Sequence, residues 1–127
     1  MTAARGANAA LAGARGHCAG LAAEAAVAAH YQRGGCPVVA RRWRGAGGEI
    51  DLIARDGRTL VFVEVKKSRD FARAATRVTA RQIARIFASA SEFLAGQPDG
   101  QDSDVRLDLA LVNASGEISV MHNAFGP

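Results

Sequence analysis

Apolar residues recur at helical spacing in two parts of the chain. The run 21–33 is rich in strong helix formers and is followed by two glycines, which commonly end helices. A second apolar stripe extends over 79–94, where the Thr79 side chain can cap the first turn. These patterns predict two helices, one on each side of a central segment that has a different period.

That central segment has the composition and the alternation of β-strands. Two β-rich runs, 49–55 and 58–66, flank Asp56 and Gly57, a pair preferred in tight hairpin turns. Further β-branched or alternating runs predict three more strands: 37–44, 105–111 and 117–122. The polar, arginine-rich residues 67–77 are expected to form a loop.

The predicted elements are expected to form one domain over residues 16–127. Residues 1–15 are small and interrupted by glycine, so we expect a flexible lead-in there. The predicted order is helix, three strands, helix and two strands, which is typical of an α/β domain.

Charge and cysteine content narrow the range of partners. The net charge of +4 favours an anionic partner, with nucleic acid first. No stretch approaches the roughly 20 apolar residues that a membrane-spanning helix needs. Cys18 and Cys36 lack the spacing of zinc ligands. We therefore expect a cytoplasmic protein with free thiols and no membrane partner.

The predicted hairpin carries a group of charged residues on one face. With Asp56 and Gly57 as the turn, Asp51 is expected opposite Phe62 and Glu49 opposite Glu64. Four side chains then share one face: Glu49, Asp51, Glu64 and Lys66. Asp51 and Glu64 become diagonal neighbours roughly 7–8 Å apart at the backbone.

Two interpretations of this charged face stay open from the residues alone. Gathered carboxylates repel one another, and a divalent cation such as Mg²⁺ would offset the repulsion and activate water. Lys66 can then position the water or stabilise the charged phosphorus centre. Apolar neighbours of Glu64, and Glu24 beside the buried face of the first helix, favour this site. The alternative is a solvated strand face with ion pairs worth less than about 1 kcal/mol each.

Residues 47–70 closely resemble the signature of the YraN family of small bacterial proteins. Shorter matching segments extend the resemblance over about residues 16–125: 20–24, 40–44, 78–82, 107–108 and 122–125. The family is placed with the restriction-endonuclease-like nucleases, which include archaeal Holliday-junction resolvases. The resemblance implies a mixed central sheet flanked by helices, with the order α-β-β-β-α-β-β.

The shared motif of those nucleases is an Asp, a spacer and then Glu-x-Lys, and Asp51, Glu64 and Lys66 match it as catalytic residues. The resemblance implies that Asp51 and Glu64 bind Mg²⁺ or Mn²⁺ with the Val65 carbonyl, and that Glu24 completes the shell. Two further positions are expected to support the site: Glu49 and Gln82. The implied activity is metal-dependent hydrolysis of DNA phosphodiester bonds, on branched or structured DNA. Because many relatives of this fold are dimers, a homodimer is a further hypothesis.

Basic residues around these positions have two interpretations as well. Five are candidates for nucleic-acid contacts: Arg42, Arg44, Lys67, Arg81 and Arg85. Trp43 is either a stacking platform for a base or part of the core. A departure from the family pattern, in which Lys67 and Ser68 precede Arg69, leaves substrate contacts through 67–77 open. The rival functions are a non-catalytic nucleic-acid-binding module in a DNA-processing assembly and a small interaction domain.

Overall fold

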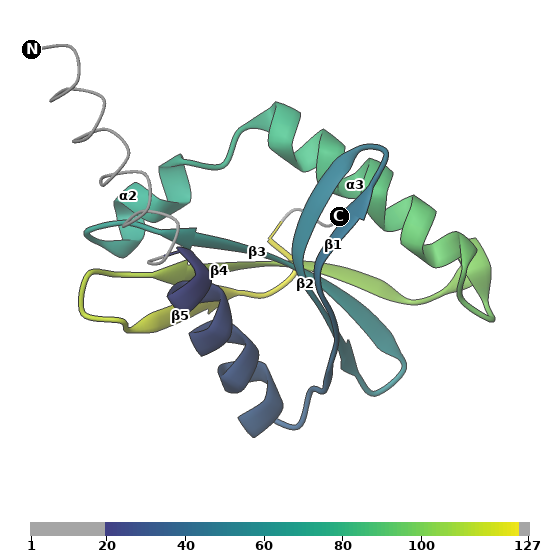
Figure 1. Cartoon of the computed structure of the whole chain (residues 1–127), viewed down its shortest axis with the longest axis horizontal. Coiled ribbons are helices and arrows are strands. Elements are labelled where there is room, and N and C mark those ends of the chain that lie inside the picture. Colours follow the sequence, from purple (N-terminus) through teal and green to yellow (C-terminus); the bar gives the residue numbers. More distant parts are fainter. Residues whose placement is uncertain (1–19, 125–127) are drawn as a thin grey trace, which may run out of the picture.

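A computed structural model describes residues 20–124, in which five strands form one mixed sheet in the spatial order β1-β2-β3-β4-β5 (Figure 1). The strands are β1 (Val38–Gly45), β2 (Gly48–Asp56), β3 (Thr59–Lys67), β4 (Val105–Val112) and β5 (Ile118–Met121). β3 and β4 are parallel, and the other neighbouring strands are antiparallel. The expected lead-in, 1–15, and Cys18 lie outside the described residues, and Cys36 is a free thiol.

Helices cover both faces of this sheet. The N-terminal helix, residues 20–33, packs on one face against Leu52 and against valines and alanines of β2, β3 and β4. On the other face lie α2 (Phe71–Thr76) and α3 (Ala80–Ala95), and the short helix η1 (Gly100–Asp102) precedes β4. Within the described part of the chain, no helix is long and apolar enough to span a bilayer. The predicted α/β architecture and its order of elements are confirmed, with one helix added.

The added helix is α2, which lies inside the segment predicted to be a loop. Asp70 caps it by accepting a hydrogen bond from the Arg73 amide at 2.8 Å. Ala74 is buried against Leu109 and Leu111 of β4. The prediction was wrong because the arginines gave this segment a polar composition. One side of the helix is nevertheless apolar and packs on the sheet.

The register of the β2–β3 hairpin also differs from the prediction. Asp56 pairs with Thr59, so the two turn residues are Gly57 and Arg58. Gly57 has φ +59° and occupies the first central position of the turn. The prediction from Asp56-Gly57 had placed this glycine at the second central position. Every cross-strand partner therefore shifts by two residues, and Phe62 pairs with Ile53 instead of Asp51.

β2 pairs with β3 only as far as Leu52 and Val63, and beyond that point it pairs with β1 alone. The free end of the β1–β2 hairpin lies beside α3 (Figure 1). The Ala46 amide donates to Glu92 Oε2 at 2.6 Å, and Ser89 Oγ donates to the Gly48 carbonyl at 2.8 Å. A Cβ on Gly47 would lie 2.8 Å from that of Ala88, so glycine permits this close approach.

Candidate functional site

Asp51 and Glu64 lie close to one another at the point where β2 leaves β3. The last pair of the two strands is Leu52–Val63, and Asp51 and Glu64 are the next residue on each strand, whereas the sequence predicted them as diagonal neighbours within the paired region. Asp51 Oδ2 accepts a hydrogen bond from the Val65 amide at 2.8 Å. Glu64 is only 6% exposed. Asp51 is half-buried, so one buried and one half-buried acid lie where strand pairing ends.

Lys66 is the cation beside these acids. Its Nζ lies 3.1 Å from Glu64 Oε1. The Gln82 amide of α3 fits best with its oxygen 2.6 Å from Lys66 Nζ and its nitrogen 3.2 Å from the Arg77 carbonyl. The opposite amide orientation leaves longer bonds, 3.5 Å to Glu64 and 3.4 Å from the Thr79 amide. Gln82 therefore contacts the lysine, and its supporting role at the site stays a prediction.

The hairpin cluster, Asp51, Glu64 and Lys66, contains more negative than positive charge. Burial, and then the Asp51 carboxylate, raise the pKa of Glu64 to about 7, although Lys66 acts in the opposite direction. Burial also raises the pKa of Asp51. The hydrogen bond from the Val65 amide and the charge of Lys66 lower this pKa, but burial outweighs them. An additional cation at this cluster would offset both the burial of these carboxylates and the repulsion of Glu64 by Asp51.

Glu24 and Glu49 lie in a neighbouring pocket of about 170 Å³, which Arg42 also lines. Arg42 Nε is 3.5 Å and Arg44 Nη2 is 3.9 Å from the Glu49 carboxylate. Burial, followed by the Asp51 charge, raises the pKa of Glu24. Among residues 20–124, no three Asp, Glu, His or Cys side chains form a group that could enclose an ion. The four predicted acids therefore form two adjacent sets: Asp51 with Glu64, and Glu24 with Glu49. Arg42 lies beside the second set.

The remaining predicted residues are placed around these sets. Four arginines are exposed: Arg42, Arg44, Arg81 and Arg85. Lys67 is half-buried. Trp43 packs edge-to-face on Phe93 at a centroid distance of 5.4 Å, so the core interpretation of this indole holds. The Val65 amide is bonded to Asp51, and metal binding by the Val65 carbonyl stays a prediction.

Sequence reasoning missed the contribution of Arg77. Its guanidinium donates to the Lys67 carbonyl at 2.8 Å, and its own carbonyl accepts from the reoriented Gln82 amide. Arg77 therefore connects the end of β3 to the start of α3. Its position just before the helix cap at Thr79 was the available signal.

These features define a class: a small α/β protein with a buried carboxylate–lysine cluster where two strands of a mixed sheet separate. The model described as "Uncharacterised protein family UPF0102" matches residues 23–112. A UPF0102 protein of Ruegeria pomeroyi is 57% identical over 114 residues, covering 90% of this chain and 93% of the relative. One of Cereibacter sphaeroides is 58% identical over 109 residues, covering 86% and 93%. The chain belongs to the UPF0102 family, which confirms the resemblance to YraN proteins.

Proposed function

We propose that this protein is a Mg²⁺- or Mn²⁺-dependent endonuclease that hydrolyses DNA phosphodiester bonds in branched or structured DNA. The observation that carries the proposal is the hairpin cluster, in which the buried Glu64 pairs with Lys66 and the half-buried Asp51 accepts from the Val65 amide, where β2 leaves β3. The restriction-endonuclease-like motif, matched by Asp51, Glu64 and Lys66, supports the same function.

The chemistry of these residues fits a hard divalent cation. Asp51 and Glu64 offer carboxylate oxygens, which Mg²⁺ and Mn²⁺ prefer. The Val65 carbonyl is the proposed third ligand, and Glu24 would complete the shell from the N-terminal helix. When bound, the cation neutralises charge on the phosphate and lowers the pKa of a bound water.

Lys66 has a separate role in the proposed reaction. Its ammonium group, held between Glu64 and Gln82, would orient the attacking water or stabilise the charge that develops on the phosphate oxygens. Its side chain is 18% exposed, so little water screens this charge. Lys66 is thereby fixed before a substrate arrives.

The proposed DNA contacts lie on elements that border the hairpin cluster. Arg42 and Arg44 belong to β1, Arg81 and Arg85 belong to α3, and Lys67 ends β3. Arg85 lies beside Gly48 at the start of β2, and the next residue, Glu49, is the carboxylate that Arg42 and Arg44 face. Basic side chains of this kind bind phosphates without reading sequence, which suits a substrate defined by shape. A homodimer would present two such sites to two strands.

One observation favours the second candidate, a nucleic-acid-binding module that does not cleave. Within residues 20–124 the acids do not converge as a group of three. A module of this kind would keep the basic residues and bind DNA in a salt-dependent manner, without turnover.

A cleavage assay on four-way-junction, linear and single-stranded DNA with Mg²⁺ or Mn²⁺ separates the two candidates. We expect cleavage by the wild type and a loss of about 100-fold or more in Asp51→Asn and Lys66→Met. Lys67→Met is the matched control, because it removes an adjacent lysine and should weaken binding only. Salt-sensitive binding without cleavage would establish the module. Equal cleavage by wild type, Asp51→Asn and Lys66→Met would contradict the nuclease proposal.

A further inference from the structure

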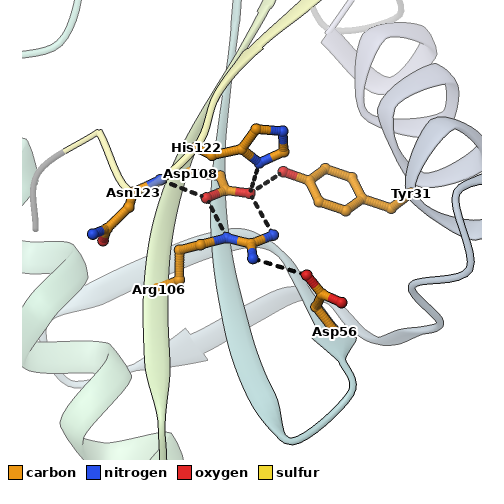
Figure 2. Close-up of polar contacts among 6 residues, drawn as sticks. All are labelled: Tyr31, Asp56, Arg106, Asp108, His122 and Asn123. Atoms are coloured by element: carbon orange, nitrogen blue, oxygen red, sulfur yellow. Dashed lines mark hydrogen bonds and ion pairs between the residues drawn. The ribbon is translucent and has the colours of Figure 1, made fainter.

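A second buried carboxylate, Asp108 of β4, lies on the sheet face that the N-terminal helix covers (Figure 2). The side chain is fully buried and receives five contacts. Tyr31 Oη donates at 2.6 Å, Arg106 donates through Nε at 2.9 Å and Nη2 at 3.2 Å, and the Asn123 amide donates at 2.9 Å. His122 Nδ1 lies 3.2 Å away.

These contacts keep Asp108 ionised. Burial would raise its pKa, but hydrogen bonds from Arg106, Tyr31 and the Asn123 amide outweigh burial and lower the pKa below its usual value. Arg106 also pairs with Asp56 at 2.9 Å, at the turn of the β2–β3 hairpin. Asp108 thereby ties together the N-terminal helix, the hairpin and the segment after β5 (Figure 2). The Asp108 cluster comprises these residues: Tyr31, Asp56, Arg106, Asp108, His122 and Asn123.

The contact with Tyr31 is the one that reaches the N-terminal helix. The fully buried residues of that helix are otherwise small: Ala23, Val27 and Ala28. They pack on Leu52 and on valines and alanines of the sheet, and apolar contacts of this kind have no directional preference. A directional hydrogen bond from Tyr31 to an immobile carboxylate resists both sliding and rotation.

Tyr31 is also placed to transmit this restraint to Glu24. The two residues are seven positions apart, which is about two helical turns and about 10 Å along the axis, so they lie on one side of the helix. Glu24 lines the pocket next to the hairpin cluster, and Asp51 acts on its charge. A shift of the helix would move Glu24 relative to Asp51.

We propose that Asp108 is a positioning residue that fixes Glu24 beside the hairpin cluster by anchoring Tyr31. The inference rests on the proposed function in one respect, since it assigns Glu24 to the cation site. The position of the helix itself does not depend on a cation and is testable alone.

The first arm of the test measures helix position by pulsed electron paramagnetic resonance on the full chain. Spin labels at Ala25→Cys and Arg58→Cys, both exposed positions, are introduced after replacing Cys18 and Cys36 by serine. Tyr31→Phe removes only the hydroxyl and should displace or broaden the distance distribution. The matched control, His122→Ala, removes another partner of Asp108 without changing the helix and should leave the distribution unchanged. Superimposable distributions for wild type and Tyr31→Phe would overturn the inference.

The second arm measures Mn²⁺ affinity by calorimetry in wild type, Tyr31→Phe, Glu24→Gln and the double variant. We expect Tyr31→Phe to weaken binding roughly threefold to tenfold, the worth of one hydrogen bond. The double variant should bind no more weakly than Glu24→Gln, because both changes act through Glu24. Additive losses would contradict the positioning role. Absence of Mn²⁺ binding in the wild type would contradict the proposed function, and the distance measurement would still decide the role of Asp108.

Discussion

The hairpin cluster and the Asp108 cluster both bury carboxylates in the same sheet, yet their environments act in opposite directions. Asp108 alone receives five contacts, and its pKa is lowered. Asp51 accepts from the Val65 amide, Glu64 pairs with Lys66, and the pKa of each carboxyl group is raised. A carboxylate whose partners are all supplied by the protein stabilises the fold. A pair that keeps unmet negative charge is suited to bind a cation.

The largest expected contrast is in stability. Asp108→Asn should lower the free energy of unfolding by about 3 kcal/mol, because it leaves buried donors without a charged acceptor. Glu64→Gln should change the same quantity by less than about 1 kcal/mol or increase it, since it removes a repulsive charge. Urea unfolding at pH 7.5 compares the two. A destabilisation by Glu64→Gln equal to that of Asp108→Asn would remove the distinction between the clusters.

The pH dependence of unfolding should separate the clusters next. The pKa of Glu64 rises from 4.5 to about 7 in the folded protein, so the folded state binds more protons between these values. The stability from this group is full below pH 4.5 and is lost as the pH rises through 7, on the order of 3 kcal/mol. Urea titrations from pH 4.5 to 8 should show this decline in wild type and a smaller one in Glu64→Gln, in which Asp51 and Glu24 remain. An identical decline in both would assign it to another group.

Asp108 should show the opposite sign. Its folded pKa lies below the usual 3.8, so the stability it contributes is present above that value and is lost as the pH falls further. Acid unfolding monitored by circular dichroism should begin below pH 4 in the wild type. Loss of this acid-induced step in Asp108→Asn is expected, and its persistence would contradict the assignment.

The smallest expected effect concerns Gln82. Gln82→Ala should lower the cleavage rate threefold to tenfold, because Lys66 loses the partner that holds it, while the free energy of unfolding changes by less than about 1 kcal/mol. Single-turnover cleavage and urea unfolding measure the two quantities. Gln32→Ala, at an exposed position of the N-terminal helix, is the control. An unchanged cleavage rate would exclude Gln82 from the site.

Much of the fold could be predicted from the sequence because helices and strands here have distinct apolar periods. The acids of the hairpin were found for the same reason, since charged residues within an apolar run are conspicuous. The register was missed because Asp56-Gly57 indicates a turn without deciding which central position the glycine takes. That shift changed the partner of Asp51 while leaving the residue on its predicted strand.

The Asp108 cluster was not predictable from local patterns. Arg106 and Asp108 alternate with leucines, a pattern that ordinarily indicates one solvated face. In the structure both faces of the sheet are covered, so the polar face needed internal partners. Tyr31 is 77 positions away from Asp108, and no spacing rule relates them. Only the three-dimensional arrangement assigns this acid to stability and not to the surface.

The most direct test of the central claim is a calorimetric titration of Mn²⁺ into wild type and Asp51→Asn at pH 8, where Glu64 is largely ionised. We expect saturable binding by the wild type and at least tenfold weaker binding by Asp51→Asn. Asp99→Asn, which changes an exposed acid outside both clusters, should bind like the wild type. Equal affinities in wild type and Asp51→Asn, or no binding by the wild type, would contradict a cation site at the hairpin cluster.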